Sequence, residues 1–239
     1  DEENSLIAEY ADNDFTPVTN SNIQYKYDKD NKILEFKLID PDGSKDMPNN
    51  YRSTAGTPWY NTLGNEVLAE LTCVKIDEGI QSIGAYSFAT NGSNCYKNLS
   101  KVVLPGSVTT IGDFAFDFEG RGLTSQLTDI DLSNVKSIGK SAFKNTHVKN
   151  LNLSKANTIG SNAFQNTEIE ELKLQNVTLG ESAFNSCKKL ISVEAESIDL
   201  DANDNGDQFG SCTSLEKFSC KSMKVIGDFT FEETGKMKS

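Results

Sequence analysis

Two copies of one phrase, Ile138-Gly139-Lys140-Ser141-Ala142-Phe143 and Ile159-Gly160-Ser161-Asn162-Ala163-Phe164, decide the fold of this chain. Each has a branched apolar residue, glycine, two variable residues, a small residue and phenylalanine. Similar copies begin at Ile83, Ile111, Leu179 and Ile226, and a degenerate copy runs from Ile198 to Phe209. The copies recur at intervals of roughly 20 to 28 residues, except where the degenerate copy intervenes, and such periods are typical of stacked repeats. The phrase therefore predicts a solenoid.

A second phrase lies between these copies and is apolar at its first, fourth and sixth positions. It starts at Leu71, Leu99, Leu127, Val148, Ile169, Leu190 and Leu215. The alternation at its end predicts a short strand with one buried face, and copies stacked in register would form a parallel sheet. We expect the glycine of the first phrase to allow a tight turn or close approach between coils. The end of the same phrase, with its phenylalanine, should form a short helical turn.

The repeated phenylalanines predict a core. We expect Phe143, Phe164 and Phe184 to be buried and stacked along the solenoid axis. Small residues stand three positions after four of the phenylalanines, which predicts a second stacked ladder that closes each coil. These residues are Thr146, Thr167, Cys187 and Cys212.

The first 66 residues lack the repeat. Residues 23–27 and 33–39 alternate around the turn-rich residues 28–31, which predicts a β-hairpin that covers the first sheet edge. Trp59, the only tryptophan, suits a cap over the first coil. We therefore divide the chain into an N-terminal segment with a hairpin cap, residues 1–66, and a solenoid of about seven repeats, residues 67–239.

The repeats resemble a known family, the BspA-like class of bacterial leucine-rich repeats. The resemblance covers roughly residues 56 to 231. It rests on the six glycine-containing phrases, on Leu104-Pro105-Gly106-Ser107-Val108, and on Gly56-Thr57-Pro58-Trp59-Tyr60 ahead of Ile76-Asp77-Glu78-Gly79-Ile80. It implies exported, surface-associated proteins, some of which bind host matrix proteins. The expected fold class is an α/β repeat, a right-handed leucine-rich-repeat solenoid with short parallel strands, short helical turns and an N-terminal β-hairpin cap.

The net charge and the hydropathy of the chain argue against two classes of partner, nucleic acid and membranes. The 239 residues include 23 Lys and Arg against 35 Asp and Glu, a formal net charge of −12, which repels nucleic acid and anionic membrane surfaces. No apolar run approaches the ~20 residues of a membrane-spanning helix. We expect an extracellular or cell-surface location after removal of an export signal, with no membrane insertion by this chain.

Catalysis and cofactors are not expected. The one histidine, His147, cannot build a multi-histidine metal site, and no nucleophile elbow or phosphate loop appears. The five cysteines show no Cys-x-x-Cys spacing, which argues against a zinc site. Cys187 and Cys212 fall at matching repeat positions, and we expect two buried thiols rather than a disulfide bond between them. Residues 201–207 resemble the start of a calcium loop, but Cys212 stands where the closing glutamate belongs, so we expect no metal.

The expected function is non-catalytic binding of a protein, because solenoids present extended surfaces whose variable positions can change without disturbing the core. The alternatives are a structural spacer that presents another domain, and a glycan-binding accessory protein. The outward third and fifth strand positions form the predicted partner-binding stripe, whose complement would be a basic protein surface, for example on a host matrix or cell-surface protein. Its candidate residues are Asp129, Asp131, Asn150, Asn152, Glu171, Lys173 and Glu194.

Overall fold

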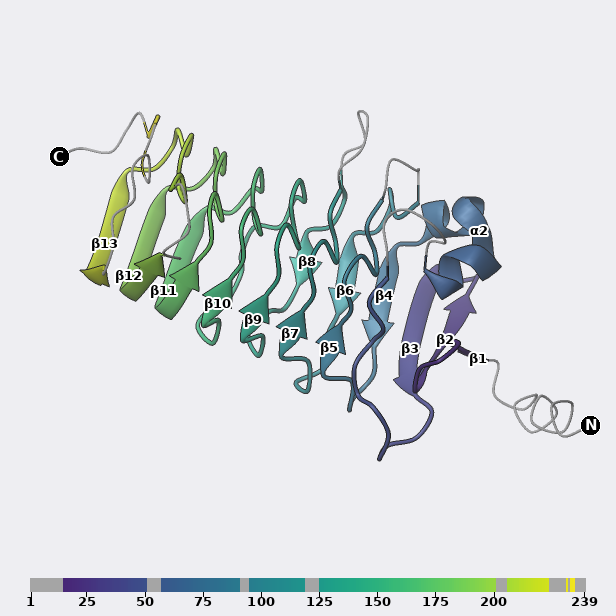
Figure 1. Ribbon diagram of the computed structural model, residues 1–239. Helices are drawn as coiled ribbons and strands as arrows, with labels where there is room; N and C mark the ends of the chain where they lie inside the picture. Colours follow the sequence, from purple (N-terminus) through teal and green to yellow (C-terminus); the bar gives the residue numbers. More distant parts are fainter. Residues whose placement is uncertain are drawn as a thin grey trace, which may run out of the picture.

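The computed structural model describes residues 15–50, 57–90, 95–118, 125–200, 206–223, 231 and 233–234. Its coils stack along one axis, with α2 and the strands β1 to β3 at one end and β13 at the other (Figure 1). The predicted solenoid is confirmed. Its handedness stays a prediction.

The first sheet contains the predicted strands of the early repeats. Its order is β1-β2-β3-β4-β6-β8, and β4 (Cys73–Ile76), β6 (Lys101–Val103) and β8 (Asp129–Ile130) pair in parallel. Val74, Ile76, Val102 and Ile130 point inward while Val103 is exposed, because the side chains of a strand point to opposite faces in turn. The strand predicted from Val148 does not form: the structure assigns no strand to residues 148–153. The two asparagines in this segment favour irregular structure.

A second parallel sheet was not predicted. Its order is β13-β12-β11-β10-β9-β7-β5. Four of its strands are only two residues long, too short to show alternation in the sequence. These are β5 (Ser82–Ile83), β7 (Thr110–Ile111), β9 (Ser137–Ile138) and β10 (Thr158–Ile159).

The last strands of this sheet are longer. They are β11 (Glu171–Leu179), β12 (Ser192–Leu200) and β13 (Lys217–Met223). In β11, Leu172 and Leu174 belong to the predicted strand phrase, while Val177 and Leu179 continue inward toward the next glycine. The short spacing between the two phrases therefore lets one strand cover both segments of the coil.

The predicted hairpin is present at the N-terminal end. β2 (Ile23–Asp28) pairs antiparallel with β3 (Ile33–Leu38), and β1 (Thr16–Pro17) adds to β2. The Asp28 carboxylate accepts hydrogen bonds from the backbone N–H groups of Asp30 and Asn31, each 3.0 Å long, which fixes the turn. β3 then pairs in parallel with β4, so the hairpin extends the first sheet. Its role as a cap stays a prediction.

Helix α2 (Pro58–Glu70) was not predicted. Thr57 caps its N-terminus by accepting a hydrogen bond from the Tyr60 N–H at 3.2 Å, and Pro58 suits the first turn. Gly64, at φ 79°, interrupts the helical backbone, so the sequence shows no continuous helical period. The helix buries Trp59, Leu68 and Ala69.

The segments around the repeated phenylalanines are turns, so the expected helical turns are not confirmed. The N–H groups of Ser141, Phe143 and Asn145 donate to the carbonyls of Ser161, Ala163 and Gln165 in the next coil, at 2.9, 2.8 and 3.0 Å. This bonding between coils competes with the bonding within a helix, because a backbone N–H is satisfied by either. The turns therefore form a third ladder between coils.

The repeated glycines allow the predicted close approach of coils. A Cβ at Gly160 would lie 2.7 Å from the Lys140 nitrogen of the preceding coil. Because that neighbour is backbone, it cannot move aside as a flexible side chain could. Only glycine fits there without shifting a coil.

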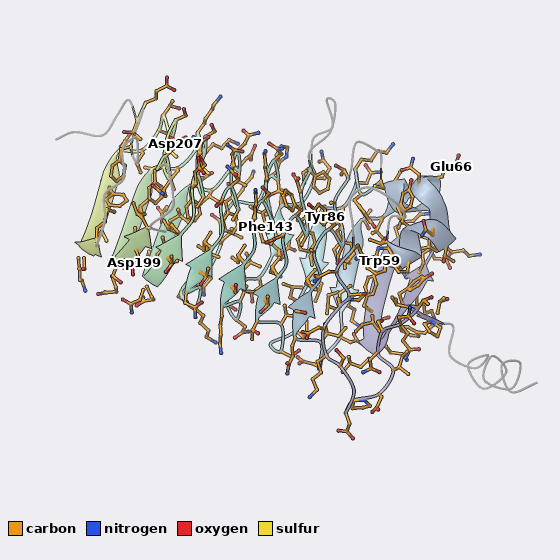
Figure 2. The ribbon with its side chains drawn as sticks, in the orientation of Figure 1. Trp59, Glu66, Tyr86, Phe143, Asp199 and Asp207 are labelled. Atoms are coloured by element: carbon orange, nitrogen blue, oxygen red, sulfur yellow. The ribbon has the colours of Figure 1, made fainter. Side chains whose placement is uncertain are left out.

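The predicted phenylalanine column is confirmed. Phe143, Phe164 and Phe184 are fully buried, and successive ring centroids lie 5.2 and 5.3 Å apart with planes within 5° of parallel. Phe209 of the degenerate repeat continues the column, so that repeat keeps its core residue. Figure 2 shows Phe143 in the interior midway along the solenoid, and Trp59 at the end that carries α2.

Candidate interaction surface

The seven candidate residues of the predicted stripe are all exposed, but they do not form one uniform surface. Asp129 is on β8, Glu171 and Lys173 are on β11, and Glu194 is on β12. Asp131 directly follows β8, whereas Asn150 and Asn152 lie in the segment without a strand. Ion pairs and hydrogen bonds separate six of these residues, all but Asn150, into two groups.

Charges on the early strands are neutralised within the surface. The Lys75 ammonium pairs with the carboxylate of Glu35, its register partner on β3, and with Asp77 at 3.1 Å. The Lys101 ammonium lies 2.9 Å from the carboxylate of Asp129, its register partner on β8, and this contact raises the pKa of Lys101. A basic partner would have to compete with Lys101 for Asp129.

Two of the candidates have local structural roles. The Asp131 carboxylate accepts a hydrogen bond from the Ser133 N–H at 2.8 Å, and the Asn152 side-chain oxygen accepts one from the Ser154 N–H at 3.1 Å. Both are the short side-chain turns that Asp and Asn form two residues before their donor. The structure therefore explains these two residues without a partner.

The later strands carry charges without such partners. Ser192 lies between Glu171 and Lys217 in one row of the sheet, and Lys173 lies beside Glu194 in the next. All four charged side chains are exposed, and none forms an ion pair with another described residue. We call Glu171, Lys173, Glu194 and Lys217 the open patch. It is available to a partner without breaking an existing pair.

The repeat pattern identifies the family. The model of the BspA type leucine rich repeat region matches in six copies, over residues 65–191 and 176–239. The chain belongs to this family. The match confirms the resemblance drawn from the glycine-containing phrases.

Solved structures of other leucine-rich repeat proteins are similar over most of this BspA-type chain. One from Eubacterium ventriosum is 16% identical, with 92% of this chain and 82% of that chain covered and a TM-score of 0.38. TpLRR of T. pallidum is 16% identical, with 90% of each chain covered and a TM-score of 0.39. No curated protein matches the chain. The assignment therefore rests on the repeats themselves.

The ladder of small residues behind the phenylalanines is present in this BspA-type solenoid. The hydroxyls of Thr146 and Thr167 donate to the carbonyls of Phe143 and Phe164 at 2.7 and 2.9 Å. The thiols of Cys187 and Cys212 donate to the carbonyls of Phe164 and Phe184, both at 3.2 Å. Both cysteines are free and buried, as predicted. The interaction with the Cys187 thiol, together with burial, raises the pKa of Cys212.

His147 lies beside an ion cluster rather than a nucleophile. The Glu168 carboxylate contacts the ammonium groups of Lys189 at 2.9 Å and Lys149 at 3.3 Å. The hydrogen bond from Lys189, with smaller contributions from Lys149 and His147, lowers the pKa of Glu168. These contacts tie three successive coils together.

No group of three or more metal-ligating side chains occurs among the residues that the structure describes. The calcium-like segment lies mostly outside them, at residues 201–205. Its last member, Asp207, accepts hydrogen bonds from Asn185 and Ser182 of the preceding coil, and burial raises its pKa. In the described part of the chain, no helix is long and apolar enough to cross a membrane.

Sequence analysis missed one exposed pair of side chains. Tyr86 and Phe114 occupy the second variable position of the glycine-containing phrase in successive coils. The copies at Ile138, Ile159 and Leu179 place Ser141, Asn162 and Ser182 there, and the copy at Ile226 places Phe229, which lies outside the described residues. An aromatic residue at a position that is small and polar in the middle copies is the signal that would have separated Tyr86 and Phe114 from the core phrase.

Proposed function

We propose that this chain is a non-catalytic binding module that recognises a protein at the cell surface or after secretion. The observation that carries the proposal is the open patch, a set of exposed and unpaired charges on in-register strands. A rigid sheet holds these side chains at fixed spacing, which reduces the ordering cost of association. The family assignment supports the same function, because leucine-rich repeats generally mediate protein interactions.

As the binding surface, we propose strands β11 to β13 rather than the middle of the predicted stripe. Asp129 already has Lys101, while Asp131 and Asn152 hold their own turns. Glu171 and Glu194 form no ion pair within 4 Å in the described part of the chain, although Lys221, which pairs with Glu196, interacts electrostatically with Glu194. The partner we propose presents basic groups opposite the two glutamates, and its attachment weakens as salt rises because the charges are exposed.

A binding screen tests this proposal. Extracellular-matrix and cell-surface proteins are screened by surface plasmon resonance against the chain and against Glu171→Lys with Glu194→Lys. We expect a partner whose binding is lost in this double variant. The matched control is Lys101→Asp with Asp129→Lys, which inverts an existing pair at unchanged net charge, and we expect it to bind normally.

The other outcomes separate the alternatives. A partner held equally well by Glu171→Lys with Glu194→Lys excludes the open patch as the binding surface. If only Lys101→Asp with Asp129→Lys loses binding, the binding site lies in the middle of the stripe. If no protein binds, the spacer function is favoured, and binding of oligosaccharides alone would favour the glycan-binding alternative.

A further inference from the structure

Tyr86 and Phe114 form a second, short aromatic column outside the core. Their ring centroids lie 4.7 Å apart with planes 5° from parallel. Both rings are half-exposed, and neither belongs to the core or to the partly buried residues packed against it. Along the solenoid, Tyr86 lies between Phe143 and Trp59 (Figure 2). The pair is therefore a surface feature on the ladder of turns.

The backbone makes this an unfavourable place for a large ring. Tyr86 and Phe114 have φ of 57° and 56°, and Ser141, Asn162 and Ser182 have the same left-handed conformation in later coils. Short polar residues tolerate this conformation better than bulky ones. The later coils show that the turn forms without an aromatic residue. Strained residues that packing does not require are concentrated at functional sites.

An acidic residue directly precedes the second ring in the chain. Asp113 directly precedes Phe114, and its carbonyl accepts a hydrogen bond from the Tyr86 N–H at 3.0 Å. One oxygen of its exposed side chain accepts from the Lys140 N–H at 2.7 Å, which holds the carboxylate in place between coils. Its second oxygen has no hydrogen-bond donor among the described residues.

We propose that Tyr86, Phe114 and Asp113 form an anchor for an arginine side chain of a protein partner. A guanidinium group stacks on an aromatic ring and hydrogen-bonds to a carboxylate at the same time, which an ammonium group does less well. Aromatic residues and arginine are also the residues that dominate binding at protein interfaces. The anchor rests on the proposed protein-binding function, but it lies on the turns and is separate from the open patch.

Peptide selection tests the anchor. A display library of random 12-residue peptides is selected on the purified chain, and the recovered peptides are measured by calorimetry. We expect peptides with an essential arginine whose affinity falls at least about fivefold in Tyr86→Ser with Phe114→Ser. Asp113→Asn should weaken the binding of the same peptides, and replacement of their arginine by lysine should weaken it as well.

The controls separate the anchor from a structural role and from the open patch. Serine is the native residue at the equivalent positions 141 and 182, so the double serine variant should keep its melting temperature within about 4 °C. A much larger fall would show that the rings stabilise the fold and would overturn the anchor. The anchor would also be overturned if the peptides lost their binding in Glu171→Lys with Glu194→Lys but kept it in the serine variant. The protein-binding function would then stand. Oligosaccharide binding that depends on the rings, with no peptide recovered, would overturn both.

Discussion

The aromatic residues pack differently in the coils and at the N-terminal end. In the coils, Phe143, Phe164 and Phe184 stack in parallel, at centroid distances of 5.2 and 5.3 Å. At the end, Phe36 meets Trp59 edge-on at 4.8 Å and 76°. A parallel column repeats the same contact from coil to coil, whereas the non-repeating residues at the N-terminal end pack at larger angles. The repeat therefore extends the core as a column, and the N-terminal residues pack in a different arrangement.

The largest expected effects come from truncating one ring in each region. Phe164→Ala should cost roughly 3–5 kcal/mol of unfolding free energy, because the ring is stacked on both faces and fully buried. Trp59→Ala should cost at least as much, since it removes contacts with Tyr25, Phe36 and Phe88. Urea denaturation measures both. An unchanged midpoint for Phe164→Ala would contradict the alignment of the repeats.

A smaller effect isolates the polar contacts at the N-terminal end. The buried Trp59 indole N–H donates to the Tyr96 hydroxyl at 3.0 Å. Tyr96→Phe leaves this donor without a partner, at a cost of about 1–3 kcal/mol. The introduced phenylalanine ring should still fill the same space, so the unfolding slope in urea should stay constant while the midpoint falls. A midpoint equal to that of the unaltered chain would show that the hydrogen bond does not contribute to stability.

The burial of the same hydroxyl predicts how the stability of the chain responds to pH. Burial raises the pKa of Tyr96 above its ordinary value, so the folded chain keeps a proton that the unfolded chain releases. Stability should therefore fall as pH rises above about 10, by up to ~1.4 kcal/mol per pH unit from this group. Unfolding free energies between about pH 9 and 11 measure the slope. Tyr96→Phe should reduce it, and an identical slope in the variant would assign the effect to other groups.

The smallest effect is expected on the paired part of the sheet. Lys101→Ala removes the ion pair with Asp129, whose side chains are 52% and 62% exposed. Solvent screens such pairs, so the melting temperature should not change measurably. Thermal unfolding monitored by circular dichroism checks this. A clear fall would show that charges on the strand face stabilise the sheet, which would weaken their assignment to binding.

Several residues show why part of this structure was predictable from sequence. The alternation in residues 23–27 and 33–39 identified the hairpin because strand side chains alternate between faces. Helix α2 was missed because Gly64 breaks its period. The strands of two residues, such as Thr158–Ile159, were missed because they exist only through pairing with neighbouring coils. The candidate stripe was exposed as predicted, but its ion pairs and turn caps depend on which residues become neighbours in space.

The repeat, the family and the phenylalanine column follow from the amino-acid sequence, because one phrase recurs and identical residues stack when the coils are in register. Which exposed charges are neutralised depends on the folded arrangement of the coils. Lys101 and Asp129 are distant in sequence and meet only because β6 and β8 are adjacent. The folded arrangement also decided that Tyr86 and Phe114 form a surface pair, since the spacing of two coils sets the distance between their rings. Periodicity specifies the core, whereas the chemistry of the surface depends on contacts between coils.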